Sequence, residues 1–557
     1  MKRVVHFGTT LFLLMGCFAN AQNIVWTGAA NSDFFNEANW KDSVTNAVPA
    51  SGTINPSQNI DLALQINVTA AITGGVIQFG TGSLAIGKAT ITATSLSGGN
   101  VTVSDGYINL SAASPLLNSV QINFTSGIGW IRTTNYSTTS VSTTNLGQIK
   151  VNGGGSVYGA NLRLDNYYLN GCVIRSNVSS TSPLTVYDGI NALGNPGLIP
   201  VNTIHSGSAI PSSMNNKIKS FILKKGFMVT FATETDGTGK SKNYIASEAD
   251  MTINSLPKTL LNSISFIRVL PWNWVTKKGR TQDVANLNST WRYSWSSVPS
   301  STVDTEFTPM AWGWSSAEDA DIATFVGKYN STHTMGFNEP DSCTGQSGQY
   351  TPTGTNNKTC VTDVAVAYYR NLMKTGMRLV SPGCTEGAAL STGWLKEFSD
   401  KATAQDVRID VIAVHWYDYG NNPQVGDSDT GAQIFARFQT YLTTVHDLYG
   451  LPIWITEFNA NPARSAAVNL AFMQLALPYL ETLSYVERYN WFYGNETANF
   501  YTTFTTPWVN GAQIFTPGTV LGDAGNFYKN QVSTPSITDA TVYAANNLNL
   551  ATCKVCP

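Results

Sequence analysis

The sequence predicts an all-β region at the N-terminus, either a β-solenoid or a β-sandwich, followed by a (β/α)8 TIM barrel. Residues 22–200 consist of short runs that alternate apolar and polar side chains and are separated by Gly, Asn, Ser and Thr, which is typical of β-strands joined by turns. From about residue 259 onward, apolar strand-like runs alternate with segments of helical periodicity, which is typical of parallel β/α units. The chain of 557 residues is long enough for two or three domains.

The charge composition argues against nucleic acid or an anionic membrane as a partner. The 33 Lys and Arg residues nearly balance the 35 Asp and Glu residues, and the formal net charge is −2, so no strong field is available to hold a polyanion. Charged residues make up 12% and hydrophobic residues 42% of the chain. This composition suits an extracellular β-rich protein better than a cytosolic helical one.

The first residues predict export. Lys2 and Arg3 precede an apolar run over residues 11–18, and Ala19-Asn-Ala21 follows as a small-residue cleavage pattern. We therefore expect a signal peptide over 1–21 and a secreted protein. Cys17 lies in a segment that resembles a lipoprotein box, so a lipid-anchored protein on the cell surface is the alternative. No later stretch is long enough to predict a transmembrane segment.

Cleavage after Ala21 would leave six cysteines, an even number that permits disulfides in an exported chain. They are Cys172, Cys343, Cys360, Cys384, Cys553 and Cys556. Cys343 and Cys360 could close one loop. The C-x-x-C spacing at residues 553–556 stands alone without a second ligand pair, so we interpret it as a terminal staple rather than a zinc site. We expect no metal, no cofactor and a monomer.

The region before the barrel divides into two parts. Runs such as Ala89–Thr94 and Val101–Ser104 within 22–200 are punctuated by Gly-Gly and Asn-Gly, as in the rungs of a solenoid, but they show no strict repeat, so a sandwich remains open. Residues 201–258 predict a small β unit with a hairpin-type turn at Asp236–Gly239.

The barrel is predicted over 259–535, before a C-terminal tail at 536–557. Plausible amphipathic helices cover Val361–Thr375 and Ala432–Tyr449. The eight expected strands are Ser265–Leu270, Trp291–Trp295, Phe307–Ala311, Thr334–Asn338, Arg378–Ser381, Val411–Trp416, Ile453–Phe458 and Val486–Phe492.

Two glutamates are the predicted catalytic residues. Glu339 follows the fourth strand and Glu457 lies at the end of the seventh, and strand ends on that face are where such barrels build their sites. Cleavage of a glycosidic bond needs one carboxyl that protonates the leaving oxygen and one carboxylate that attacks the anomeric carbon or activates water. Strands four and seven lie on opposite sides of a barrel mouth, so the two carboxyl groups can face each other across a sugar.

Several motifs resemble those of glycoside hydrolase family 128, the glycosyl hydrolase catalytic core. They are Gly336-Phe-Asn-Glu-Pro-Asp341, Ser381-Pro382, Val414-His-Trp-Tyr417, Trp454-Ile-Thr-Glu-Phe458, and Lys277-Lys-Gly279 with Trp291-Arg-Tyr-Ser-Trp295. The resemblance covers about 260–530. It implies a retaining (β/α)8 hydrolase of clan A, a family whose known members are mainly endo-β-1,3-glucanases. It also implies that Glu339 is the general acid/base, Glu457 the nucleophile, and Asn338 a ligand of the sugar 2-hydroxyl.

Further candidates line the same strand ends. His415 and Tyr417 share strand parity and are expected to point into the mouth, as are the pair Trp491 and Tyr493. Trp272 and Trp312 are expected to stack on sugar rings. Asp341 is expected to cap the next helix, and Glu386 to line a subsite.

Trp454 has the opposite parity to Glu457, so we expect it to face the surrounding helices.

These observations predict a secreted, retaining, endo-acting glycoside hydrolase that cleaves a polysaccharide, with β-1,3-glucan favoured by the resemblance. One alternative is a hydrolase of another extracellular polysaccharide, such as an algal galactan. A non-catalytic carbohydrate-binding or adhesive surface protein is a second alternative, against which the presence of both Glu339 and Glu457 speaks.

Overall fold

The computed structural model describes residues 90–113, 117–178, 180–281, 287–328, 330–420, 428–492 and 520–537, together with short segments between 24 and 86 and at 500, 508–509 and 512–513. The predicted signal peptide with Cys17, the predicted site residue Tyr493, and the tail with Cys553 and Cys556 lie outside the described residues. The chain divides into two compact units, Met1–Asn123 and Phe124–Pro557.

The first unit is built from short strands that pair in parallel with strands one turn of chain away. Ile77 pairs with Leu96, and Leu96 pairs with Leu117. Such ladders favour the solenoid alternative over a sandwich of antiparallel sheets. The three ladders are β3 (Ile60–Leu62), β6 (Ile77–Gln78), β9 (Leu96–Ser97) and β12 (Leu117–Asn118); β4 (Ile66–Val68), β7 (Ser83–Ile86) and β10 (Asn100–Val103); and β5 (Ile72–Gly74), β8 (Thr90–Ala93) and β11 (Tyr107–Leu110).

The second unit begins with β14 (Trp130–Thr133), α1 (Thr138–Thr144), β15 (Ile149–Val151), β17 (Leu162–Tyr167) and β18 (Gly171–Ser176). An antiparallel β-sandwich follows, with four strands in each sheet. One sheet contains β20 (Pro196–Ile199), β19 (Leu184–Tyr187), β22 (Ser220–Leu223) and β25 (Met251–Ile253). The other contains β21 (Ile204–Ser206), β26 (Phe266–Pro271), β23 (Phe227–Ala232) and β24 (Ser241–Ala246).

The sandwich corrects the prediction for the first barrel strand. Residues 265–270 form most of β26, which pairs antiparallel with β21 and β23. The rings of Phe221, Phe231 and Tyr244 meet between the two sheets. The small β unit predicted for 201–258 therefore extends from β19 to β26.

Eight parallel strands build the C-terminal part, and seven of them were predicted. They are β27 (Arg280–Thr281), β28 (Trp291–Tyr293), β29 (Glu306–Phe307), β30 (His333–Met335), β31 (Arg378–Val380), β32 (Ile412–Trp416), β33 (Ile453–Phe458) and β34 (Val486–Trp491). They form three separate sheets, β27-β28-β29, β30-β31 and β32-β33-β34. Single parallel bridges connect the sheets at Met310–Met335, Val380–Val411 and Lys278–Tyr489. The result is a barrel-like ring of linked sheets rather than one continuous closed sheet.

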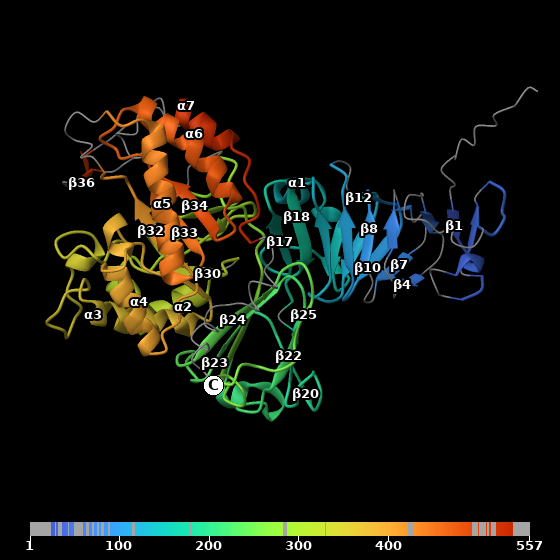
Figure 1. Cartoon of the computed structure of the whole chain (residues 1–557). Coiled ribbons are helices and arrows are strands. Elements are labelled where there is room, and N and C mark those ends of the chain that lie inside the picture. The colour runs from blue at the N-terminus through green and yellow to red at the C-terminus, as the bar shows by residue number, and fades with distance from the viewer. Residues whose placement is uncertain are drawn as a thin grey trace, which may run out of the picture. The chain divides into compact units, whose positions relative to one another are not determined.

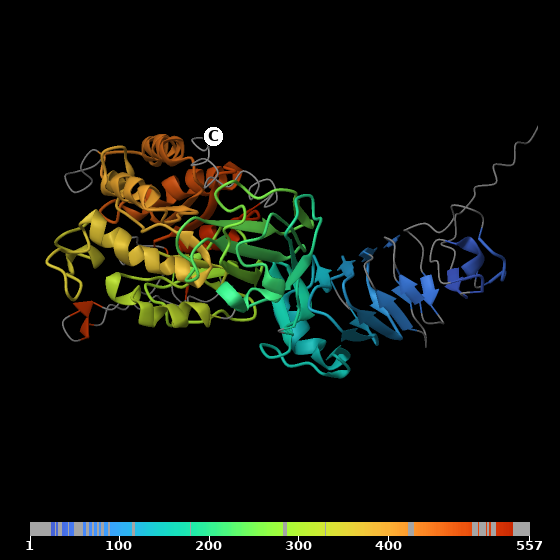
Figure 2. The ribbon, with the colours of Figure 1, turned by 90° about the horizontal axis from the view of Figure 1, so that it is seen from below.

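Helices cover the outside of this ring (Figures 1 and 2). They are α2 (Asp319–Val326), α3 (Thr362–Tyr369), α4 (Trp394–Ala404), α5 (Gly431–Tyr449), α6 (Ala466–Thr482) and α7 (Asp523–Asn530). Helix α5 begins at a capping box of Thr430 and Gln433 and ends at Gly450, whose φ of 60° suits glycine. Among the described residues, no helix is long and apolar enough to cross a membrane.

The space inside the ring is filled in layers. The N-terminal ends of the strands carry buried ion pairs, Arg378 with Glu487 at 2.7 Å and Arg488 with Glu306 at 2.8 Å. Above them lies an inner cluster of Val275, Trp291, Tyr293, Met310, Met335, Val380, Val411, Ala413 and Trp454. An outer cluster, which includes Ile412, Val414, Trp416, Phe438, Phe472 and Trp491, packs between strands and helices. Because the lower layers are filled, substrate access is left to the C-terminal ends of the strands.

Candidate active site

The backbone around Glu339 is held in an unusual conformation just beyond β30. Its φ is 44°, in the left-handed region that non-glycine residues seldom occupy. The Glu339 N–H donates to the carbonyl of Gly383 at 2.8 Å, and the Asn338 N–H donates to that of Trp312 at 2.9 Å. Gly336 is required for this approach, because a Cβ there would lie 2.8 Å from the Pro382 nitrogen. Such strain is a feature of functional sites, where it fixes the direction of a side chain.

A β-bulge directs Glu457 toward Glu339. Val414 of β32 pairs with Ile455 of β33, but the next residue, His415, pairs with Glu457, so Thr456 is an extra residue on β33. A bulge of this kind shifts the side-chain alternation by one. Trp454 and Glu457 therefore both face the interior, and the prediction that Trp454 faces the helices is wrong.

Three aromatic side chains surround the Glu457 carboxylate. Trp295 Nε1 donates to Oε1 at 3.0 Å, and the Tyr417 hydroxyl donates to Oε2. The Tyr293 hydroxyl lies 3.5 Å from Oε1 and donates to the Thr456 carbonyl at 2.9 Å. Burial and the charge of Glu457 raise the pKa of Tyr417, so this hydroxyl remains a donor. With 6% of its surface exposed, Glu457 is held as an oriented carboxylate.

His415 connects the two glutamates. Its Nδ1 lies 2.8 Å from Glu339 Oε1 and 3.6 Å from Glu457 Oε2, and the side chain is buried. Burial alone would lower the pKa of His415, but the charge of Glu457 and the hydrogen bond to Glu339 outweigh it and raise the pKa to about 9. Burial would likewise raise the pKa of Glu339, but the hydrogen bond and charge of His415 outweigh it and lower the pKa. In the free site, the proton shared by this pair therefore resides on the imidazole.

One atom from each of Glu339, His415 and Glu457 lies within 4.8 Å of the others. The two carboxylates thus face each other at close range across the mouth, as predicted from the strand order. The same three groups are a possible ligand set for a metal ion. With a pKa of about 9, the imidazolium is protonated at neutral pH, and a metal would have to displace that proton to bind at Nδ1.

Residues 269–511 match the family model described as "Glycosyl hydrolase catalytic core". The matched range covers most of the C-terminal part. The resemblance predicted from the motifs is confirmed, and the six side chains that meet in the site, Tyr293, Trp295, Glu339, His415, Tyr417 and Glu457, lie within the matched range.

The individual relatives share low sequence identity with this chain. Alkali-sensitive linkage protein 1 of Schizosaccharomyces pombe is 28% identical over 239 residues, which is 42% of this chain and 39% of the relative. The chain thus spans about two fifths of that protein's length.

Solved structures of family 128 also match. An endo-β-1,3-glucanase of Amycolatopsis mediterranei, in complex with laminarihexaose, is 27% identical over 46% of this chain and 100% of that one, with a TM-score of 0.37. A curdlan-specific exo-β-1,3-glucanase of Blastomyces gilchristii is 25% identical over 46% and 97%, with a TM-score of 0.34.

The site contains two further features beside Glu339. Asn338 is buried and donates to Gln346 at 3.2 Å, while its Oδ1 has no hydrogen-bond partner in the structure. Trp312 is half-buried, and its ring meets that of the exposed Tyr350 at 5.9 Å. Asn338 and Trp312 thus lie where the sequence placed them, next to Glu339.

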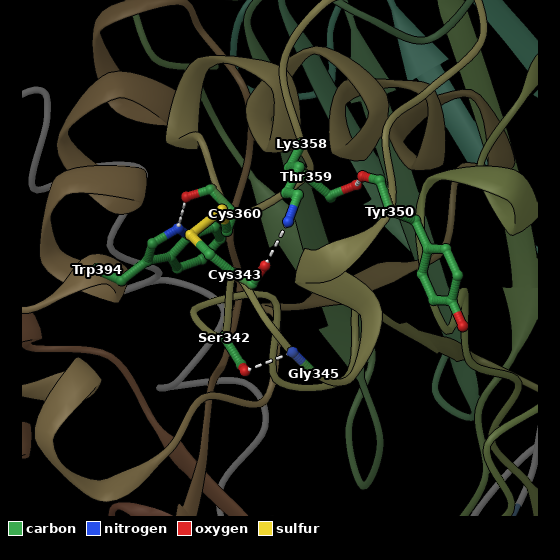
Figure 3. The surroundings of a disulfide bond; sticks show 8 residues. All are labelled: Ser342, Cys343, Gly345, Tyr350, Lys358, Thr359, Cys360 and Trp394. Carbon is green, nitrogen blue, oxygen red and sulfur yellow. Dashed lines mark hydrogen bonds between the residues drawn. A yellow bond between two sulfur atoms is a disulfide. The ribbon is translucent and has the colours of Figure 1, made fainter.

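A disulfide fastens the loop that follows Glu339 (Figure 3). Cys343 and Cys360 are bonded, as predicted, and Cys172 and Cys384 are buried and free. Lys358 Nζ donates to the Cys343 carbonyl at 2.8 Å, and Trp394 Nε1 donates to the Cys360 carbonyl at 2.6 Å. These contacts fix the loop that contains Tyr350, whose ring lies beside that of Trp312.

Three predicted positions are corrected. Trp272 follows β26 of the sandwich, and its ring lies 5.8 Å from that of His333, at the N-terminal ends of the strands and away from the site. Trp491 belongs to the outer cluster and packs 5.3 Å from Phe458, because the alternation along β34 turns it toward the helices. Asp341 caps no helix and instead accepts hydrogen bonds from Thr385.

Glu386 lies half-buried in a 3-10 helix over Glu386–Ala389. Burial, with the charge of Asp418, raises its pKa.

Sequence reasoning missed Trp295 and Tyr293 as partners of Glu457. The signal was present, because residues 291, 293 and 295 are aromatic at every second position and so share one face of a strand.

Proposed function

We propose that the glycosyl hydrolase core is a retaining, endo-acting enzyme that hydrolyses β-1,3-glucan by double displacement. The observation that carries the retaining mechanism is the approach of Glu339 and Glu457 to within 4.8 Å. Retaining enzymes hold their two carboxyl groups about 5–5.5 Å apart, whereas inverting enzymes need about 6.5–9.5 Å to admit a water molecule.

In the first step, a Glu457 oxygen attacks the anomeric carbon while the bond from that carbon to the glycosidic oxygen breaks. Glu339 gives its proton to the departing oxygen. In the second step, Glu339 takes a proton from water, the water oxygen attacks the anomeric carbon, and the bond to Glu457 breaks. Trp295 and Tyr417, which donate to Glu457, keep its oxygens oriented for attack.

The proton for the first step needs a source, since the pKa of Glu339 is lowered in the free site. His415 supplies one, because its Nδ1 lies 2.8 Å from Glu339 Oε1. When a bound sugar excludes water, the charged carboxylate becomes less favourable, and the proton moves along this hydrogen bond to Glu339. His415 is then neutral until Glu339 is protonated again in the second step.

The choice of β-1,3-glucan rests on the resemblance of the motifs to family 128. A screen of purified mature protein against β-1,3-glucan, other β-glucans and algal galactans tests it. Release of a ladder of oligosaccharides from β-1,3-glucan would support endo action, and activity only on another polysaccharide would overturn the substrate assignment.

The mechanism is tested by substituting the nucleophile. We expect Glu457→Gln to abolish turnover and to leave polysaccharide binding largely intact, whereas Glu397→Gln, which removes an exposed carboxyl on α4, keeps wild-type turnover. Azide should rescue Glu457→Gly and give a glycosyl azide of inverted configuration. Wild-type hydrolysis by Glu457→Gln would refute the mechanism and favour a non-catalytic role for the pair.

We also propose that the protein is secreted as a monomer. The Cys343–Cys360 disulfide supports an oxidising compartment. N-terminal sequencing of the exported protein distinguishes cleavage after Ala21 from lipidation at Cys17, and light scattering gives the oligomeric state.

A further inference from the structure

A cavity lies at the end of the barrel opposite Glu339 and Glu457. Its volume is about 400 Å³, within the range of about 300–1,000 Å³ that is usual for small-molecule sites. One wall is the turn between β17 and β18, with Tyr168 and Asn170, and the other is the segment after α7, with Asn530 and Gln531. Asn288, which precedes β28, contributes as well, so the cavity lies at the N-terminal ends of the strands.

Both walls are hydrogen-bonded to the same segment of chain, residues 274–278. The Tyr168 N–H donates to the Trp274 carbonyl at 2.9 Å. Lys278 Nζ donates to the carbonyls of Tyr528, Lys529 and Gln531 at 2.9, 3.0 and 2.7 Å. A cavity with walls held in this way is formed before a ligand arrives, which lowers the entropy cost of binding.

The lining is suited to a neutral sugar. Tyr168 offers a half-buried ring for the C–H face of a sugar, and the amides of Asn170, Asn530 and Gln531 can donate to hydroxyls and accept from them. Among the described residues that line the cavity, only Lys529 is charged. Leu169 and Val532, exposed at 39% and 79%, add apolar surface at the rim.

We propose that this cavity is a non-catalytic glycan-binding site that holds a short segment of the polysaccharide substrate. The proposal rests on the proposed function, because it takes the ligand to be a β-glucan. Its position away from Glu339 and Glu457 means that a short oligosaccharide cannot occupy both sites at once. The cavity therefore acts on long or insoluble chains, where it keeps the catalytic core close to its substrate.

The test compares binding and catalysis in the full-length protein. One variant is Tyr168→Ala. A second variant combines Asn170→Ala with Asn530→Ala; Asn170 and Asn530 are exposed, so replacing them should not disturb folding. We expect each variant to bind insoluble β-1,3-glucan about fivefold more weakly in a pull-down, as expected for the loss of one stacking ring or two hydrogen bonds. Both variants should keep wild-type kcat and KM on a short soluble oligosaccharide, and the asparagine variant also the wild-type melting temperature.

The outcomes separate this proposal from the proposed function. If the wild-type protein hydrolyses β-1,3-glucan but both variants bind it like wild type, the second site is refuted and the enzyme function stands. If the wild-type protein hydrolyses nothing and still binds glucan through Tyr168, the second site stands alone. A wild-type dimer that both variants convert to a monomer, with unchanged glucan binding, would show a contact between copies instead and overturn the proposal.

Discussion

Replacement of His415 by Gln should change how stability depends on pH. In the folded protein the pKa of His415 is raised from 6.5 to about 9. At about 1.4 kcal/mol per pKa unit, this difference corresponds to about 3 kcal/mol of stabilisation. Because the folded pKa lies above the unfolded one, the stabilisation is fully present below pH 6.5 and is lost as the pH rises through about 9. Glutamine cannot carry the charge and removes this dependence.

The measurement is urea unfolding followed by tryptophan fluorescence at pH values between 6 and 9.5. Burial lowers the pKa of Lys225 and Lys278 to about 8, so both lysines titrate in the same window in both proteins. The difference between wild type and His415→Gln therefore isolates the imidazole, and His446→Gln, on α5, is a matched control. Equal pH dependence in wild type and His415→Gln would refute the proposed charge on His415.

The same variant should alter the pH dependence of catalysis. In wild type, the basic limb of kcat/KM reports loss of the proton that His415 and Glu339 share, so it should follow the pKa of about 9. In His415→Gln, Glu339 titrates without that partner, and the basic limb should move to lower pH. If the basic limb of kcat/KM lies at the same pH in wild type and His415→Gln, Glu339 does not receive its proton from His415.

Three further predictions concern the fold and the site. Cys343→Ser with Cys360→Ser opens a loop with a sequence separation of 17 and should lower the free energy of unfolding by about 3 kcal/mol; an unchanged urea midpoint would contradict it. Gly279→Ala places a Cβ 2.3 Å from the buried Trp291 ring and should cost about 1–3 kcal/mol or more, whereas Gly155→Ala, where the space is open, should cost little. Activity should survive EDTA, since the proposed mechanism uses no metal; loss that a divalent cation restores would assign the two glutamates and the histidine to a metal.

The facing positions of the two glutamates could be predicted because the signals for them are local. Glu339 follows an apolar strand and Glu457 lies near the end of one, and parallel strands bring their C-terminal ends to one face. His415 and Tyr417 were placed correctly by simple alternation along β32, which has no extra residue of its own. These positions depend only on strand type and parity, both of which can be read from a single segment.

Alternation failed where the partner strand decided the outcome. Thr456 is an extra residue only in relation to β32, with which β33 pairs. The sequence of β33 by itself contains no signal that predicts a bulge. Strict alternation counted from Glu457 therefore predicted that Trp454 faces the helices, whereas it lies in the inner cluster. The bulge places a large ring in the inner cluster and a carboxylate in the mouth three residues later, which strict alternation does not allow.

The first barrel strand, β27, was missed because the two lysines that lead into it have distant hydrogen-bond partners. Lys277 Nζ donates to three carbonyls at the end of α6, and Lys278 Nζ to three at the end of α7. Helix C-termini leave carbonyls without partners and carry partial negative charge, so two buried lysines are stabilised there. Before those helices are placed, Lys277-Lys278 looks like an exposed turn, and the apolar run at 265–270 looks like the better strand. The hydrophobic pattern identifies a strand only when its interior side chains are apolar, and here the helix ends supply the partners that stabilise the charged segment before β27.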